Sequence, residues 1–195
     1  ICWSCCSSCA ISWKIFSPSS NGGDFIEANF VRSTLDTFTI LVDSREQDTA
    51  KFHQRLAKFS CPVVRTKLDF GDYSAQVTLP SGVTFSLADK VTIERKMSLD
   101  ESANCWTTSR DRFKREFERA QAKDAKVYLL IEQATWEKAY HGYYRSQMKP
   151  QALVASMTTW MARYDSPILM CTPDTSGQLI YDVLYREMKE ALIQL

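Results

Sequence analysis

An uninterrupted apolar run at residues 127–131 (VYLLI) constrains the fold of this chain more than any other feature of its sequence. A strand with one exposed face alternates apolar and polar residues, whereas a run without alternation needs cover on both faces. The chain offers that cover, because residues 110–123, 150–164 and 177–195 repeat apolar residues at helical spacing. We therefore predict an α/β protein in which helices flank a mixed central sheet.

Short stretches rich in β-branched and aromatic residues supply the other strands. Residues 73–79 and 83–87 flank Pro80-Ser81-Gly82, a turn sequence, so we expect them to pair as a hairpin. A further helix is expected at residues 49–59. The remaining strands are predicted at residues 38–42, 62–68, 90–94 and 168–171.

The composition changes near Thr37. Residues 17–24 (SPSSNGGD) are turn formers, which indicates a loop or linker. We accordingly divide the chain into a Cys-rich N-terminal appendage and linker at residues 1–36 and a single domain at residues 37–195. With 195 residues, 45% of them hydrophobic, the chain can build one such core.

No apolar run approaches the roughly 20 residues that a membrane helix needs. The first residues also lack the basic segment of a secretory signal, so we expect an intracellular protein without membrane contact. The net charge is only +1, and a surface that binds nucleic acid would therefore have to be local.

The chain contains 7 cysteines, an odd number without a regular framework, which argues against a secreted disulfide scaffold. Cys61, Cys105 and Cys171 are scattered, and we interpret them as small core residues. The N-terminal group forms two abutting Cys-x-x-Cys pairs. Structural zinc sites space their pairs further apart, so free thiols are expected here, with Zn²⁺ shared with a second chain or a distant residue as the alternative. The group consists of Cys2, Cys5, Cys6 and Cys9.

Acidic residues lie at or beside three predicted strand ends. Asp43 follows the first strand, Asp72 precedes the hairpin, and Glu94 ends the strand at residues 90–94. Mg²⁺ takes oxygen ligands, usually one or two protein carboxylates together with water and phosphate. Glu94 and Lys96 point to the same face of an extended strand, because side chains alternate with a period of two. The pattern indicates a divalent-cation site with an ammonium group beside a metal-bound water.

An acid followed by Glu-x-Lys on a strand resembles the PD-(D/E)xK pattern of nucleases with a restriction-endonuclease-like fold. The fuller string is more specific: Gly71-Asp72, a spacer with the hairpin, then Glu94-Arg95-Lys96 and Asp100. It resembles the GD…ERKxxxD signature of the XPF-type nuclease domain. Residues 42–46 (VDSRE) are similar to the VDxRE strand end that opens those domains. The resemblance runs from about residue 38 to the C-terminus and identifies residues 37–195 as such a domain.

The resemblance implies a metal-dependent DNA endonuclease, which hydrolyses phosphodiester bonds with Mg²⁺ or Mn²⁺. It also implies branched, flapped or single-strand-containing substrates, in recombination or repair. Asp72 and Glu94 would bind the metal, with Asp43 as a further acid of the metal site and Glu46 in support. Lys96 would activate water or stabilise charge on the phosphate.

The same resemblance gives Arg45 and Arg95 the task of holding phosphate or the surrounding acids. Asp100 would orient Arg95 or the neighbouring lysine. Arg110 and Arg112 open a basic helix directly after the site strand. Two interpretations of this helix remain open, a solvated face of close ion pairs and a set of contacts to DNA phosphates.

Two rival functions also remain open. One is a catalytically silent DNA-binding or scaffolding partner of another nuclease, and the other is a nuclease that acts on plain duplex. All acids of the signature and its lysine are present, which favours an enzyme. The wide apolar stripe between Leu179 and Leu192 leads us to expect a homodimer through the C-terminal helices, with a heterodimer with a related chain as the alternative.

Overall fold

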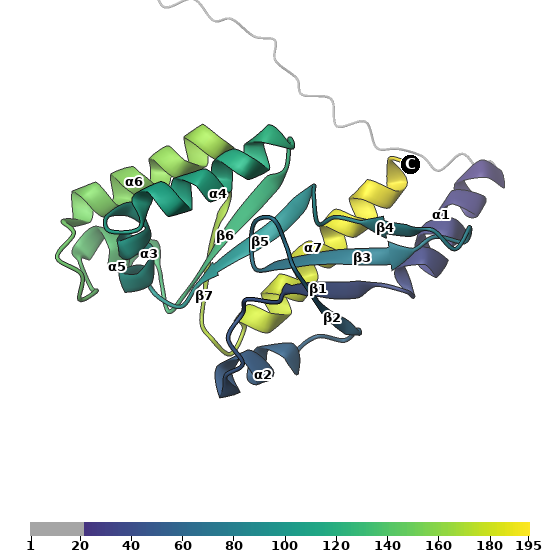
Figure 1. Ribbon diagram of the computed structural model, residues 1–195. Helices are drawn as coiled ribbons and strands as arrows, with labels where there is room; N and C mark the ends of the chain where they lie inside the picture. The colour runs from purple at the N-terminus through teal and green to yellow at the C-terminus, as the bar shows by residue number, and fades with distance from the viewer. Residues whose placement is uncertain (1–21) are drawn as a thin grey trace, which may run out of the picture.

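Seven strands form one mixed sheet in residues 22–195, the part of the chain that the computed structural model describes (Figure 1). The strands are β1 (Thr39–Asp43), β2 (Val63–Thr66), β3 (Tyr73–Thr78), β4 (Thr84–Ser86), β5 (Val91–Lys96), β6 (Lys126–Glu132) and β7 (Ile168–Cys171). The helices are α1 (Gly22–Leu35), α2 (Ala50–Leu56), α3 (Leu99–Trp106), α4 (Arg110–Ala122), α5 (Trp136–His141), α6 (Pro150–Tyr164) and α7 (Ser176–Ile193). The α/β architecture that we predicted is confirmed.

Strand directions bring the ends of distant segments to one edge of the sheet. The order is β2-β1-β3-β5-β6-β7, and β4 pairs with β3 as the predicted hairpin. β1 and β5 each run antiparallel to β3, while β6 and β7 continue parallel to β5. The carboxyl ends of β1, β5 and β6 therefore meet at the edge where β3 begins. This edge carries the acidic residues of the sequence motifs.

β6 is covered on both faces, as its uninterrupted apolar sequence requires. Leu129 and Ile131 belong to a core that includes Phe117 and Trp160 of the helices on one face. Leu130 belongs to a second core on the opposite face, with Leu184 of α7. The alternation along the strand thus divides the hydrophobic interior into two layers.

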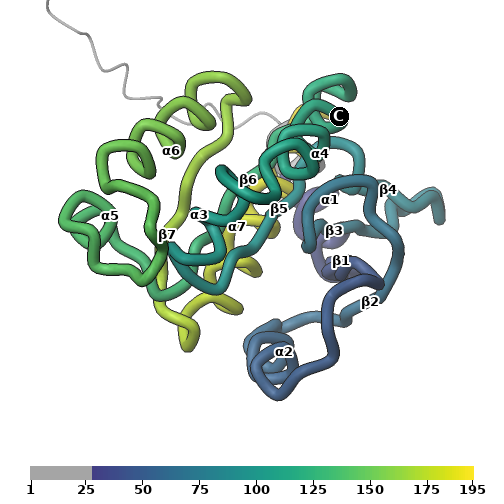
Figure 2. The backbone as a smooth tube through the Cα atoms, turned by 60° about the vertical axis from the view of Figure 1, so that its left-hand side comes forward, coloured from purple at the N-terminus to yellow at the C-terminus, as the bar shows by residue number. Residues whose placement is uncertain are grey.

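The helices form two layers, one on each face of the sheet (Figures 1 and 2). Helices α3, α4, α5 and α6 pack together on one face of the sheet, where Trp160 stacks on Phe113 with 5.2 Å between ring centroids. Helix α7 crosses the other face, flanked by α1 and α2. The site edge therefore receives side chains from both layers.

Helix α7 uses its apolar stripe within its own chain. Ile180, Leu184, Met188 and Leu192 are buried in the core that α7 shares with the sheet. Leu179, the remaining edge of the stripe, is partly buried against the same core. This packing takes up much of the apolar area on which the homodimer prediction rested, and the oligomeric state remains a prediction.

The segment before Thr37 contains a helix that the sequence patterns did not predict. Val31 and Leu35 of α1 are buried against the core of α7. The predicted linker at residues 17–24 overlaps the first turn of this helix. The N-terminal cysteines and their alternative zinc site lie outside the described residues, and the domain division at residue 36 remains a prediction.

None of the helices in residues 22–195 combines the length and the apolar character that crossing a membrane requires.

Of the scattered cysteines, Cys105 is buried and Cys61 and Cys171 are partly buried, all three with free thiols.

Candidate active site

Asp72 is fixed at the centre of the site edge by its own backbone. Its N–H donates to the carbonyl of Ile93 at 2.8 Å, and its carbonyl accepts from the N–H of Asp43 at 2.8 Å. The preceding Gly71 has φ = 70°, and a Cβ there would lie 2.6 Å from Thr92. Only glycine fits this turn, which explains why the motif reads Gly-Asp.

Glu94 and Lys96 lie on the same face of β5, as strand geometry predicts. Both are nearly inaccessible, at 4% and 8% exposure. The Lys96 ammonium donates to Oε1 of Glu94, while Oε2 of Glu94 is buried without a hydrogen-bond partner in the described part of the chain. Asp72 uses its Oδ2 to accept from the N–H of Arg95 at 2.7 Å. The structure therefore brings Asp72, Glu94 and Lys96 together.

The site holds more negative charge than its one ammonium neutralises. Burial, with the charges of Glu46 and Glu116, raises the pKa of Asp72 to about 7 against the opposing effect of Lys96. Burial and the charge of Asp72 also raise the pKa of Glu94 well above its usual value. Burial lowers the pKa of Lys96, but Glu94 and Asp72 outweigh it and raise that pKa overall. A cation entering the site would relieve this repulsion.

The donor set fits a divalent cation. Among residues 28–195, whose side chains the structure describes, Oε2 of Glu94 has no hydrogen-bond partner and Oδ1 of Asp72 accepts no hydrogen bond. Two carboxylates with free oxygens are what Mg²⁺ or Mn²⁺ usually takes from a protein. No cluster of three or more metal-ligating side chains occurs in the same residues, so water and phosphate would complete the coordination.

Asp43 has both carboxylate oxygens occupied. Oδ1 accepts from the N–H and the Nε of Arg45, each at 2.7 Å, and Oδ2 accepts from the N–H of Leu68 at 2.8 Å and from Nη2 of Arg45 at 2.9 Å. Burial raises the pKa of Asp43, but these hydrogen bonds outweigh it and lower that pKa overall. Asp43 positions Arg45 and the turn after β1, and its part as a metal ligand remains a prediction.

Glu46 lies beside the site on the opposite face from Glu94. Its Oε2 accepts from the hydroxyl of Tyr73 at 3.4 Å and lies 3.9 Å from Nη1 of Arg55. The Arg55 guanidinium also donates to the Tyr73 hydroxyl at 2.9 Å. Glu46 therefore belongs to a buried polar network, within electrostatic reach of Asp72.

Arg95 binds an acid that the sequence motifs did not indicate. Its Nε and Nη2 donate to the two oxygens of Glu132, at 3.0 and 2.8 Å. Glu132 ends β6 and is 2% exposed. Of the two tasks expected for Arg95, the structure shows the holding of an acid.

The expectation that Asp100 orients Arg95 or Lys96 is wrong. Its Oδ1 accepts from the backbone N–H groups of Arg145 and Ser146, both at 2.7 Å. Asp100 lies in the first turn of α3, which points its carboxylate toward the loop before α6 rather than toward β5. It tethers that loop to α3.

The basic helix divides into two parts. Lys114 pairs with Glu118 at 3.0 Å, as a solvated face of ion pairs predicts. Arg110 and Arg112 are exposed at the start of α4, and neither forms an ion pair with another described residue. Their contact with DNA phosphates remains a prediction.

Sequence reasoning missed three charged residues near the site: Arg55, Glu116 and Glu132. Oε1 of Glu116 accepts from the N–H of Gly71 at 3.0 Å and so fixes the Gly-Asp turn. The only signal for Glu132 was an acid at the end of an otherwise apolar strand. Their partners are distant in sequence, so spacing alone could not reveal them.

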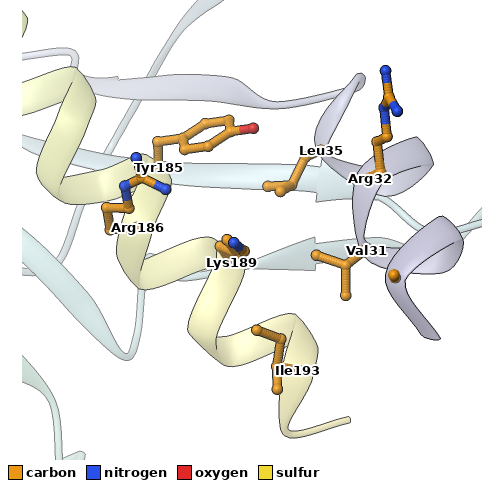
Figure 3. A pocket seen from close by; sticks show the side chains of 8 residues that line it. Val31, Arg32, Leu35, Tyr185, Arg186, Lys189 and Ile193 are labelled. Carbon is orange, nitrogen blue, oxygen red and sulfur yellow. The ribbon is translucent and has the colours of Figure 1, made fainter. Parts of the chain in front are cut away.

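A groove of about 490 Å³ lies away from these acids, between α1 and α7 (Figure 3). Its lining combines apolar side chains with three cationic ones. It contains none of the predicted site residues. The lining consists of Ala28, Val31, Arg32, Leu35, Tyr185, Arg186, Lys189 and Ile193.

Comparison with known proteins matches this chain to a protein family and to solved structures of a similar fold. A family model described as the ERCC4 domain matches residues 42–183. XPF from Aeropyrum pernix has a TM-score of 0.55 at 18% identity, over 76% of this chain and 61% of that chain. XPF from Aeropyrum pernix in complex with DNA has a TM-score of 0.55 at 19% identity, over 78% of this chain and 66% of that chain. A search of curated proteins found no match.

At such low identity the structural likeness shows the fold alone, and this chain spans less than two thirds of either XPF chain. The family match is broader evidence, because it covers most of the chain and contains Asp43, Asp72, Glu94 and Lys96. It confirms the resemblance carried by the GD…ERKxxxD motif. The chain belongs to the ERCC4 domain family.

Proposed function

We propose that this protein is a Mg²⁺- or Mn²⁺-dependent endonuclease that hydrolyses phosphodiester bonds of DNA. One observation carries the proposal: among the residues that the structure describes, Oε2 of Glu94 is buried without a hydrogen-bond partner, beside Asp72 and Lys96, in an ERCC4 domain. Burying an unpartnered carboxylate oxygen is unfavourable for folding, and such a group is typical of a site built for a ligand.

Asp72 and Glu94 would hold the cation through their free oxygens, with Asp43 as a more distant acid. When bound, the cation supplies an activated water and stabilises charge on the phosphate. Arg95 contributes through its backbone N–H, which holds Asp72 in place. Glu46 adds negative charge from the opposite face.

Lys96 would act as a cation. Its raised pKa keeps the amino group protonated at neutral pH. It can therefore donate a hydrogen bond to a phosphate oxygen and balance the charge that builds there during cleavage. With Glu94 binding a cation, the Lys96 ammonium would be free to contact the substrate.

DNA would approach along the edge where β1, β5 and β6 end. Arg45 is exposed along most of its side chain while Asp43 holds its guanidinium. Arg110 and Arg112 extend the positive surface along the start of α4. Phosphate contacts of this kind supply affinity without sequence preference.

The substrates would be branched, flapped or single-strand-containing DNA, in recombination or repair. XPF from Aeropyrum pernix was solved in complex with DNA, and the fold of this chain is similar. Labelled flap, fork, four-way junction and linear duplex should be incubated with the protein in Mg²⁺, Mn²⁺ or EDTA. Cleavage of the first three with metal, and not in EDTA, is expected. Equal cleavage of linear duplex would favour a nuclease of plain duplex.

DNA binding without cleavage in either metal would support a catalytically silent partner of another nuclease.

We also propose a homodimer, or a heterodimer with a related chain, although α7 buries much of the apolar stripe that first suggested a dimer. Light scattering over a concentration series, with and without DNA, tests this assembly. A constant monomer mass would exclude the homodimer.

A further inference from the structure

Glu132 is a buried acid whose charge is fully compensated. Oε1 accepts from Nε of Arg95 at 3.0 Å and from Nη2 and Nε of Arg55 at 3.3 and 3.4 Å, while Oε2 accepts from Nη2 of Arg95 at 2.8 Å. Burial raises the pKa of Glu132, but the hydrogen bonds of Arg95 outweigh it, and the pKa is lowered overall. The carboxylate is therefore ionised at neutral pH.

Arg95 connects Glu132 directly to the candidate metal site. Its side chain holds Glu132 on one face of the sheet, while its backbone N–H holds Oδ2 of Asp72 at 2.7 Å. Arg95 therefore links Glu132, through a single residue, to an oxygen of the candidate metal site that Glu132 itself never touches.

Arg55 makes a second connection. Its guanidinium lies between Glu132 and the Tyr73 hydroxyl, and 3.9 Å from Glu46. Without Glu132, two buried guanidinium groups would have Glu46 as their nearest remaining acid. Both cations would then shift toward the acids of the site, because an unpaired buried charge is costly.

We propose that Glu132 is a positioning residue for metal binding, which keeps the charges of Arg55 and Arg95 away from Asp72 and Glu46. This inference rests on the proposed function and adds a residue to it. Groups that orient metal ligands from behind typically change metal affinity or activity by about 10- to 100-fold when they are mutated. Glu132 has the geometry of such a group.

The test measures Mn²⁺ binding to the whole chain without DNA, by electron paramagnetic resonance of the free ion. Glu132→Gln keeps the shape of the side chain and removes its charge. We expect Mn²⁺ to bind about tenfold more weakly to this variant. The Mn²⁺ concentration for half-maximal cleavage should rise by the same factor. Glu132→Asp keeps the charge and should recover most of the affinity.

Glu187→Gln is the matched control. Glu187 of α7 pairs with Lys126 and Tyr128 at the opposite end of β6. The Glu187→Gln substitution therefore weakens a polar contact to β6, the strand that also carries Glu132, but far from the site edge. Circular dichroism must show all variants folded at the temperature of the measurement, and Mn²⁺ binding by Glu187→Gln should match that of the natural chain.

Unchanged Mn²⁺ binding by folded Glu132→Gln would overturn the inference and leave the proposed function standing. An equal loss in Glu187→Gln would also overturn it, because general destabilisation would then explain both. Absence of Mn²⁺ binding by the natural chain would reject the proposed function itself. If Glu132→Gln fails to fold, Mn²⁺ binding by Glu132→Asp decides: this variant keeps the charge, so near-natural binding supports the inference and a loss of about tenfold overturns it.

Discussion

Glu94, near the end of β5, and Glu132, at the end of the neighbouring parallel strand β6, are almost equally buried, at 4% and 2% exposure, yet their surroundings are opposite. Glu132 accepts hydrogen bonds from two guanidinium groups, and its pKa is lowered. Glu94 shares one ammonium with Asp72 and keeps an oxygen without a partner, and its pKa is raised. Two glutamates at the same depth thus have opposite effects: Glu132 contributes to the stability of the fold, whereas Glu94 lowers it.

The difference shows where folding and function compete. A compensated buried acid contributes to a fixed network, whereas an uncompensated one costs stability until a cation arrives. The two acids also face opposite layers: Glu94 pairs with Lys96, whose ammonium lies over the Phe113 ring of α4, and Glu132 pairs with Arg55 of α2. The sheet separates the strained site from the network that supports it.

The largest effect expected from this comparison is loss of cleavage. Glu94→Gln and Asp72→Asn each remove a proposed metal ligand and preserve shape, so cleavage should fall by about a thousandfold or more. DNA binding should persist, since both changes also relieve repulsion of phosphate. Gel assays of binding and of cleavage measure the two effects, with exposed Glu190→Gln as the control. Near-normal cleavage by either variant would refute the ligand assignment.

Stability should respond in opposite directions at the two acids. Glu132→Ala leaves Arg55 and Arg95 unpaired and should lower the free energy of unfolding by about 3–5 kcal/mol. Glu94→Gln should raise it by about 1 kcal/mol without metal, because it removes the excess negative charge while Asp72 still compensates the Lys96 ammonium. Urea denaturation in EDTA gives both values. Destabilisation of the same size by both variants would contradict the claim that Glu132 is compensated and Glu94 is not.

Metal should stabilise the natural chain. Mn²⁺ at about 100 times its dissociation constant adds roughly 2.7 kcal/mol, or about 5–10 °C in melting temperature for a chain of this length. Glu94→Gln should lose this shift. Thermal melts with Mn²⁺ and with EDTA give the comparison, and a full shift in the variant would place the cation elsewhere.

Asp72 should make metal-free stability depend on pH. Its folded pKa of about 7 lies above the ordinary value of 3.8. The folded state therefore holds this proton more tightly, and the contribution is lost as pH rises from about 4 to 7. Asp43 and Glu132 have lowered pKa values and act in the opposite direction. The difference between the natural chain and Asp72→Asn isolates the effect, and a difference that is constant over this range would contradict the raised pKa.

The smallest effect is expected at the basic helix. Arg110→Gln and Arg112→Gln should each reduce the slope of log affinity against log salt by about 1, if each arginine binds one phosphate. Lys114→Gln is the matched control, since Lys114 already pairs with Glu118. Identical slopes in all four proteins would leave this helix a solvated face.

The sequence predicted the parts of the site that depend on local spacing. Glu94 and Lys96 share a face because they lie two residues apart on a strand, and the apolar run of β6 indicated cover on both faces. The buried network escaped prediction, because Arg55 and Glu132 are 77 residues apart and meet only through strand order. Asp100 was misassigned for a related reason. Asp100 is close to Lys96 in sequence, but sequence distance does not show where a side chain points. In the first turn of α3, the Asp100 carboxylate points toward the loop at Arg145.

The most direct test of the metal site is a crystal of the natural chain soaked in Mn²⁺ and measured for anomalous scattering. We predict a peak in contact with Oδ1 of Asp72 and Oε2 of Glu94, with the Lys96 ammonium displaced from Glu94. The peak should disappear in Glu94→Gln. An occupied Mn²⁺ site elsewhere in the crystal, with the pair of Glu94 and Lys96 intact, would contradict the proposal that these acids form the catalytic centre.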